Sequence, residues 1–179
     1  RARRTRVALA TALRPQPRLR SAARPTTALD GTTQAGVLAI LDGLRSKLHH
    51  AMLFITHNLE LAAAICDRTV VMYAGQVVEV RESNKLHEQP LHPYTAALAA
   101  ARPNIDTTAH RLTAIPGRPL SAFEAPPDAC AFTARCPHVA DVGRPRRPSL
   151  VELDGELTRC GRASGLFGSL RVTLNACAG

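Results

Sequence analysis

Short apolar runs alternate with helical segments in the first half of this 179-residue chain, and this alternation constrains the fold more than any other feature. Residues 51–56 (AMLFIT) and 69–75 (TVVMYAG) are apolar, contain β-branched side chains and are too short for a core helix, so we predict two buried strands. Residues 58–68 (NLELAAAICDR) predict a helix between them. A longer helix, with Asp30 suited to its N-cap, is expected because apolar side chains repeat at spacings of three and four: Val37, Ile40, Leu41, Leu44 and Leu48.

The order of these elements predicts an α/β fold. Strands and helices that alternate with short connections are typical of a mostly parallel sheet with crossover helices. Residues 76–80 (QVVEV) predict a further strand, expected at the sheet edge and joined to its predecessor by a tight turn that ends at Gly75. Functional groups in such sheets gather at the carboxyl ends of the strands, which indicates the loop at 23–27 and His57.

Composition excludes some classes of function. Hydrophobic residues make up 45% of the chain and charged residues 21%, and no apolar run approaches the roughly 18 residues that a membrane span needs. The net charge is +9, with eight Arg and no acidic residue in 1–29. A nucleic-acid arm or a transit peptide would share that bias, but aromatic residues are only 3% of the chain, so we favour a basic helix surface and expect no nucleic-acid partner.

The second half of the chain has weaker periodicity. Residues 83–90 and 92–101 predict short helices, residues 102–129 are rich in Pro and predict an extended connection, and Cys130 to Gly179 predict a small appendage. Five Cys are present, and an odd number favours reduced thiols over a disulfide framework. The chain begins with Arg1 rather than Met, so we expect a fragment or a processed product.

Five sequence blocks together resemble the ATP-binding subunits of ABC transporters. They are PTTALD at 25–30, ITHNLELAAAICDRTVVMYAGQVVE at 55–79, HPYTAALAAARP at 92–103, IPGRPL at 115–120 and CAFTARCPH at 130–138. The first two are general to ABC ATPases, and the others are specific to the oligopeptide and dipeptide importer branch. The resemblance implies an incomplete P-loop NTPase-type parallel sheet with crossover helices in 1–82 and the C-terminal Cys-containing extension of that branch in 83–160. Residues 161–179 lie beyond it, and their weak periodicity predicts a disordered tail.

The resemblance also implies roles for individual residues. Residues 6–13 (RVALATAL) match the helix after the family's signature motif, which holds the γ-phosphate of ATP bound to the opposite subunit. Asp30 ends the segment that matches the D-loop, which crosses the dimer interface. His57 matches the switch histidine, which hydrogen-bonds the γ-phosphate and the attacking water.

Two departures from the family pattern affect the chemistry. The phosphate-binding P-loop and the glutamine loop have no counterpart in these residues. The Walker B strand of the family ends in Asp-Glu-Pro, whereas this chain has Ala23, Arg24 and Pro25. The Asp organises Mg²⁺ and the Glu polarises water; alanine does neither, and arginine is a permanent cation that cannot act as a base.

The cysteines match a second family feature in part. The branch often carries four Cys that hold an iron–sulfur cluster, and Cys130, Cys136 and Cys160 match three of them, while Gly143 stands at the position of the remaining one. A cubane cluster uses four thiolates. Zinc held by the three Cys with His138 is an alternative, although Cys136 and His138 are close for common ligand spacing, and unligated reduced thiols are the simplest interpretation.

The resemblance thus implies a fragment of the ATP-binding subunit of a peptide-importing ABC transporter, with ATP and Mg²⁺ as the family's cofactors. Such subunits lie peripherally at the cytoplasmic face of the inner (plasma) membrane, work with a second ATP-binding subunit and with membrane subunits, and do not bind the peptide directly. Because Ala23 and Arg24 replace the acids, we expect this chain to be inactive alone. Two alternatives stay open: a non-catalytic interaction module that docks on a complete ATPase subunit, and a decayed, pseudogene-like product.

Overall fold

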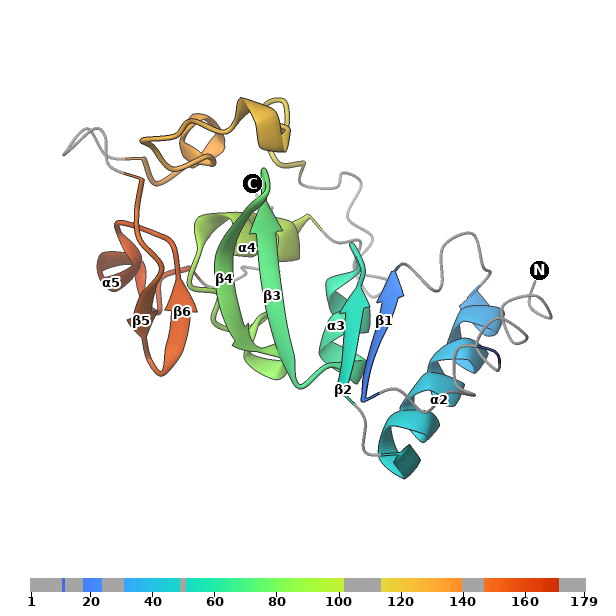
Figure 1. The fold of residues 1–179 in the computed structure, drawn as a ribbon. Coiled ribbons are helices and arrows are strands. Elements are labelled where there is room, and N and C mark those ends of the chain that lie inside the picture. The colour runs from blue at the N-terminus through green and yellow to red at the C-terminus, as the bar shows by residue number, and fades with distance from the viewer. Residues whose placement is uncertain are drawn as a thin grey trace, which may run out of the picture. The chain divides into compact units, whose positions relative to one another are not determined.

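The computed structural model describes residues 11, 18–23, 31–48, 51–101, 114–139 and 147–170, and the following account concerns these residues. The chain divides into two compact units, Arg1–Cys66 and Asp67–Gly179 (Figure 1). The strands around residues 68–82 pack with later elements of the second unit, and the domain boundary expected between residues 82 and 83 stays a prediction.

The first unit is a strand–helix–strand–helix arrangement. Strands β1 (Leu19–Ala23) and β2 (Ala51–Ile55) pair in parallel, with Leu19 opposite Ala51 and Ala23 opposite Ile55. Helix α2 (Gly31–Leu48) connects them and helix α3 (Leu59–Ile65) follows β2 (Figure 1). The α/β class and a parallel pair are therefore confirmed, but the mostly parallel sheet is not, because the strand predicted at 69–75 lies in a separate antiparallel sheet.

The helices of this unit begin and pack as their sequences dictate. The Asn58 side chain caps α3, accepting hydrogen bonds from the backbone N–H groups of Glu60 (3.0 Å) and Leu61 (3.2 Å). Four apolar side chains of the two helices are buried: Val37, Leu41, Leu61 and Ala62. Of the predicted stripe on α2, Val37 and Leu41 are buried and Ile40 is exposed, while the side chains of Leu44 and Leu48 lie outside the described part.

The second unit is built on an antiparallel sheet in the order β3-β4-β6-β5. Its strands are β3 (Arg68–Tyr73), β4 (Gln76–Glu82), β5 (Val151–Leu153) and β6 (Glu156–Thr158). The tight turn between β3 and β4 is confirmed: Ala74 and Gly75 both have positive φ, at 47° and 74°, as expected for a two-residue hairpin.

Two strand predictions need correction. The QVVEV strand, expected at an edge, lies between β3 and β6, because the short β5–β6 hairpin adds to its free side. The strand at 69–75 was expected to be buried, but Val70 and Met72 are exposed because only the opposite face of β3 is covered. A β-bulge places Val71 opposite Glu79 and Met72 opposite Val77, so Val78 is the extra residue of β4.

Short helices complete the second unit. The predicted helix at 92–101 is confirmed as α4 (Pro93–Ala100), whereas the segment at 83–90 holds only the 3₁₀ turn η1 (Ser83–Lys85). Two further 3₁₀ turns follow, η2 (Ala122–Glu124) and η3 (Thr133–Arg135). Helix α5 (Ala163–Leu166) lies where the sequence suggested a disordered tail, of which 171–179 lie outside the described residues. Among the described helices, none combines the length and the apolar character needed to cross a membrane.

Candidate functional site

The carboxyl edge of the β1–β2 sheet brings together two of the residues singled out by sequence. Ala23 ends β1 opposite Ile55, which ends β2, and His57 lies two residues beyond Ile55. His57 is exposed. The residues before and after it are joined by a hydrogen bond, which the Asn58 N–H donates to Thr56 Oγ1 over 3.0 Å. The start of α3 therefore fixes the backbone on which the imidazole is presented at this edge.

The donor set of this edge does not fit a Mg²⁺–ATP site as it stands. Ala23 offers a methyl group where the resembled family has the carboxylate that organises Mg²⁺. Arg24 and Asp30 lie outside the described residues, as do most of the residues matched to the signature helix. Thr56 and His57 are the polar side chains that the two described strand ends contribute, and they can position a phosphate or a water but cannot hold a hard divalent cation.

The three candidate metal ligands gather in the second unit. Burial is the main cause that raises the pKa of the Cys136 and Cys160 thiols, and electrostatic interaction with Cys130 raises both pKa values further. Arg162 joins the two segments that carry them, because its Nη1 donates to the carbonyl oxygen of His138 over 2.8 Å. The three cysteines are therefore near enough to interact electrostatically, and their role as metal ligands stays a prediction.

The same thiols do not fit a metal centre in their described arrangement. Cys66, Cys130, Cys136 and Cys160 are free thiols. Across the part of the chain that the structure describes, no group of three or more His, Cys, Asp or Glu side chains is placed to hold a metal ion, and Gly143 lies outside that part. Raised thiol pKa values also oppose the thiolate form that binds metal.

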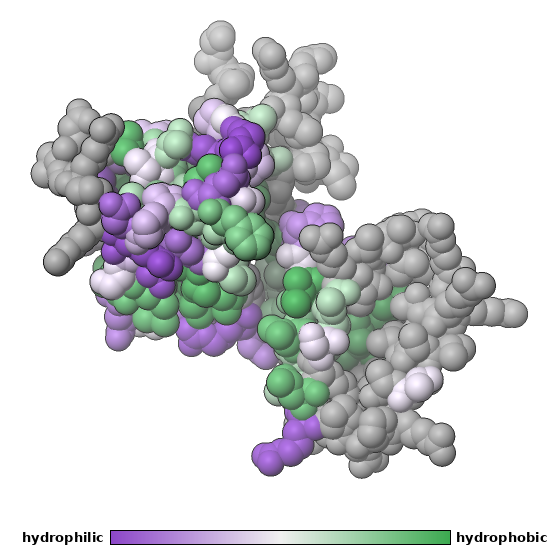
Figure 2. All heavy atoms as spheres, turned by 45° about the horizontal axis from the view of Figure 1, so that its top comes forward, coloured by the Kyte–Doolittle hydropathy of each residue, from purple (hydrophilic) through white to green (hydrophobic). Residues whose placement is uncertain are grey.

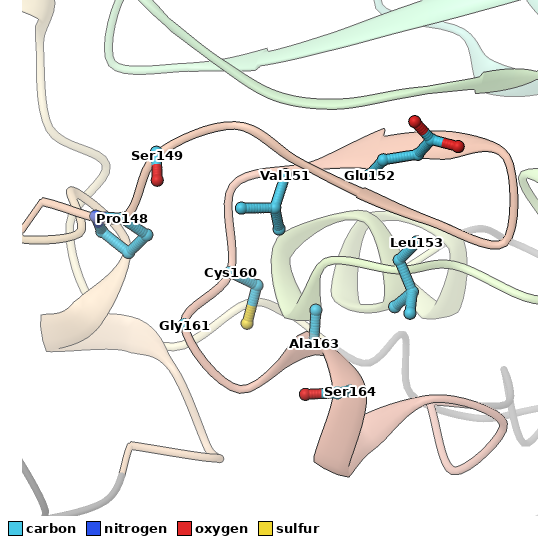
Figure 3. Close-up of a pocket in the computed structure, with 9 residues that line it drawn as sticks. All are labelled: Pro148, Ser149, Val151, Glu152, Leu153, Cys160, Gly161, Ala163 and Ser164. Atoms are coloured by element: carbon cyan, nitrogen blue, oxygen red, sulfur yellow. The ribbon is translucent and has the colours of Figure 1, made fainter.

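A shallow pocket adjoins one of these cysteines. It has a volume of about 280 Å³ and lies between the β5–β6 hairpin and the start of α5, with Cys160 beside Val151 and Ala163 (Figure 3). Ser149, Ser164 and Glu152 add polar groups at its walls. The thiol therefore lines a pocket, and nothing in the sequence pattern pointed to it.

Sequence reasoning missed a buried polar cluster under β4. The Glu79 carboxylate is fully buried and accepts hydrogen bonds from the backbone N–H groups of Leu91 (3.0 Å) and His92 (2.9 Å). Burial raises the pKa of Glu79 more than these bonds and the Thr95 side chain lower it. The available signal was an acidic residue in the middle of the apolar QVVEV run.

His92 belongs to the same cluster. Its Nδ1 accepts a hydrogen bond from the Tyr94 N–H (3.0 Å) and so caps α4. Burial lowers the pKa of His92 to about 4, and an interaction with the backbone of Arg159 offsets only part of that effect. The imidazole is therefore neutral at neutral pH and serves as the N-cap of α4.

Four of the sequence blocks meet at one aromatic cluster, which consists of Tyr73, Tyr94 and Phe132. Tyr73 packs against Tyr94 with ring centroids 4.7 Å apart and against Phe132 at 5.4 Å. The Arg135 guanidinium adds hydrogen bonds to the Tyr73 hydroxyl (3.3 Å) and to the carbonyl oxygens of Ile115 (3.1 Å) and Pro116 (2.7 Å). The cluster thus joins four blocks: TVVMYAG, HPYT and CAFTARCPH through their side chains, and IPG through its backbone carbonyl oxygens.

Comparison with known proteins agrees with this block structure. Residues 78–142 match the family described as oligopeptide/dipeptide transporter, C-terminal region. The chain is 38% identical over 157 residues to the oligopeptide transport ATP-binding protein OppD of Salmonella typhimurium, covering 88% of this chain and 47% of OppD. It is 39% identical over 156 residues to the dipeptide transport ATP-binding protein DppD of Escherichia coli, covering 87% of this chain and 47% of DppD.

The chain therefore spans about half the length of the curated relatives it matches. The aligned part includes the edge with Ala23 and His57 as well as the aromatic cluster, because it covers nearly nine-tenths of the chain. These matches show that the chain is similar, over nearly nine-tenths of its length, to oligopeptide and dipeptide transport ATP-binding proteins of ABC transporters, with a match to the oligopeptide/dipeptide transporter C-terminal region at residues 78–142.

Proposed function

We propose that this chain supplies the C-terminal half of the ATP-binding subunit of a peptide-importing ABC transporter. The observation that carries the proposal is the carboxyl edge of the parallel β1–β2 pair, where Ala23 and His57 lie at neighbouring strand ends. A phosphate-binding edge of a parallel α/β sheet has this arrangement. The relatives' names, oligopeptide and dipeptide transport ATP-binding protein, support the same role.

In this role His57 hydrogen-bonds the γ-phosphate of ATP and the attacking water. A neutral imidazole suits the task because it can donate from one nitrogen and accept at the other. Asp30 lies in the D-loop and contacts the second ATP-binding subunit across the dimer interface. The subunit pair acts peripherally at the cytoplasmic face of the plasma membrane and drives membrane subunits, which bind the peptide.

Ala23 and Arg24 make this chain inert as an ATPase on its own. ATP and Mg²⁺ are the cofactors of the proposed subunit, and a carboxylate at the Ala23 position would supply the Mg²⁺ ligand that a methyl group cannot. An arginine at the next position cannot take a proton from water. Cys130, Cys136 and Cys160 remain reduced thiols in this proposal, because Gly143 stands where a four-thiolate cluster would need its remaining Cys ligand.

The test is ATP turnover by the full purified chain with Mg²⁺. We expect no phosphate release above background from the chain, from its His57→Ala variant or from the matched control His138→Ala, which changes a histidine of the second unit. Mg²⁺-dependent hydrolysis by the unaltered chain that His57→Ala abolishes and His138→Ala preserves would contradict the proposed inactivity.

A second arm tests the proposed site itself. The double variant Ala23→Asp/Arg24→Glu restores the two acids, and it is combined with the half of Escherichia coli DppD that lies outside the aligned part. We expect ATP turnover from this combination, lost on His57→Ala and kept on His138→Ala. Turnover that does not depend on His57 would overturn its assignment.

A further inference from the structure

Three cysteines of the second unit lie in one small region, which we call the thiol cluster: Cys130, Cys136 and Cys160. All three are free thiols and half-buried, so none of them is sealed from solvent. Cys130 interacts electrostatically with both others, and it acts on Cys160 more strongly than Cys136 does. Such interactions fall off with distance, so the three sulfur atoms are neighbours.

Hydrogen bonds hold the first two members of the thiol cluster on one compact turn. The Cys130 carbonyl oxygen accepts from the Thr133 N–H (3.1 Å) and from the Thr133 hydroxyl (2.8 Å). The Cys136 N–H donates to the Thr133 carbonyl oxygen (3.3 Å). Phe132, in the same turn, is fully buried in the aromatic cluster. The backbone that carries Cys130 and Cys136 is therefore anchored to the core of the second unit.

Cys160 reaches the thiol cluster from a different segment, the connection between β6 and α5. The Ala163 N–H donates to its carbonyl oxygen (3.1 Å). Arg162, two residues after Cys160, donates from Nη1 to the carbonyl oxygen of His138, two residues after Cys136, over 2.8 Å. The two segments are therefore held together by a contact that does not involve sulfur.

The Cys160 thiol also has a route to solvent. It lines the shallow pocket of about 280 Å³ between the β5–β6 hairpin and α5, and Figure 3 shows its side chain at the wall of that pocket. Ser149 and Ser164 make part of the same wall polar. A small polar oxidant such as hydrogen peroxide can therefore reach the sulfur through the pocket.

We propose that Cys130 and Cys160 are a redox-sensitive pair that hydrogen peroxide converts into a disulfide. The Cys160 thiolate attacks one peroxide oxygen, the O–O bond breaks, and a sulfenic acid and water form. The Cys130 thiolate then attacks the sulfenic sulfur, so the S–S bond forms and hydroxide leaves as water. Overall, two thiols and one peroxide give one disulfide and two waters. This modification goes beyond the proposed function, in which the same thiols stay reduced.

The disulfide has a consequence for the second unit. It joins the turn at 130–136 to the connection between β6 and α5. A link that closes a loop of about 30 residues stabilises a fold chiefly by restricting the unfolded chain. Oxidation should therefore fasten the β5–β6 hairpin and α5 to the turn, and reduction should release them.

The test uses the full chain, reduced and then treated with hydrogen peroxide at neutral pH. Remaining thiols are alkylated, and the peptides are mapped by mass spectrometry without reduction. We expect one intramolecular link between Cys130 and Cys160, a mass lower by two hydrogen atoms, and a midpoint of thermal unfolding that rises by at least about 5 °C. Dithiothreitol should reverse all three changes.

Serine variants make the result specific. Cys130→Ser and Cys160→Ser should each abolish the link, whereas Cys136→Ser should leave it intact. Cys66→Ser is the matched control, because Cys66 is a half-buried cysteine of the first unit, and it should also leave the link intact. Thermal unfolding of each reduced variant shows whether it folds, so a missing link is not confused with misfolding.

Dependence on the fold is measured separately. In urea the link should form at least about tenfold more slowly, because unfolding separates the two segments and closing the loop then costs entropy. Four outcomes would overturn the proposed pair: oxidation that stops at sulfenic or sulfinic acid, a link from Cys160 to Cys136 or to another chain, an equal rate in urea, and an unchanged midpoint of unfolding after the link has formed.

Discussion

At the scale of single residues, burying a carboxylate in an apolar strand costs several kcal/mol unless hydrogen bonds replace its lost water. Glu79 receives two such bonds from the Leu91 and His92 backbones, which ties the start of α4 to β4. His92 caps the same helix through its own side chain. The two buried ionisable groups therefore make the stability of the second unit depend on pH.

The His92 contribution has a definite sign. Its pKa is about 4 in the fold against 6.5 for a free histidine, so the unfolded state binds more protons between these values. The free energy of unfolding should therefore fall as the pH drops from about 6.5 to about 4, by up to about 3 kcal/mol from this group. Glu79, whose pKa is raised, acts in the opposite direction and needs a control.

The variant His92→Asn supplies that control. Asparagine keeps an N-cap acceptor but does not titrate, and Glu79 is present in both proteins. Denaturant unfolding of the two proteins at a series of pH values should show the wild type losing stability relative to the variant below pH 6.5. Parallel pH profiles would show that His92 does not set this dependence.

Individual residues of the candidate site could be placed from the sequence only where they lie on or next to a helix or strand. His57 follows β2, whose apolar run is visible in the sequence, whereas β1 (LRSAA), which Ala23 ends, has no such run, and its place beside β2 came from the expected order of elements and from the resemblance. Arg24, Asp30 and Gly143 lie in loops outside the described residues and stay predictions. Glu79 was missed because its burial depends on a bulge, which no periodicity reveals.

At the scale of elements, the β3–β4 turn is the tightest point of the second unit. Gly75 has φ +74°, and a Cβ at this position would lie 2.8 Å from the Cβ of Ala122. Gly155, in the β5–β6 turn, has φ +72° with nothing within 4 Å of its Cβ position. Substitution at either glycine therefore meets the strain of a positive φ, but only substitution at Gly75 also meets a steric clash.

Alanine at each glycine tests this difference. Gly155→Ala should cost about 1 kcal/mol through its positive φ alone, and Gly75→Ala should cost about 1–3 kcal/mol more because Ala122 must move. Thermal or denaturant unfolding measures both costs. Equal destabilisation by the two substitutions would contradict this prediction, because it would mean that Ala122 in η2 moves away at no cost in free energy.

Element predictions succeeded where local signals were strong. The β2, α3 and α4 segments carry apolar runs or caps, and the turn at Gly75 joins two β-branched runs. The β5–β6 hairpin went unpredicted because its strands have three residues each, too few to show an alternation. That omission also produced the wrong edge position for β4.

At the scale of the whole molecule, the two units differ in how much they bury. Among the side chains that the structure describes, the buried apolar residues of the first unit are Val37, Leu41, Leu61 and Ala62, whereas those of the second include Tyr73, Leu86, Leu91 and Phe132 with their neighbours. The first unit also exposes Leu19, Leu53 and Ile55 on a sheet face that parallel strands normally cover, and hydrophobic side chains reach the surface in Figure 2. Its local stability should therefore be the lower of the two.

Amide hydrogen exchange of the unbound chain checks this expectation. Backbone amides in β1 and β2 should exchange faster than those in β3 and β4. The Phe123→Asp variant should give the same pattern, since Phe123 contributes no burial. Faster exchange in β3 and β4 than in β1 and β2 would show that the second unit does not hold the more stable core.

The Val78 bulge bears on how this chain can be recombined with its relatives. The bulge turns Glu79 inward, so its carboxylate accepts hydrogen bonds from the backbone N–H groups of Leu91 and His92. Glu79 ends the block that is general to ABC ATPases, whereas His92 begins the first importer-specific block. A chimera joined after Glu82 would separate this acceptor from its donors unless the recipient has the same bulged strand. A chimera joined before Arg68 takes the β3–β4 hairpin, the Glu79 carboxylate and α4 from the same parent protein.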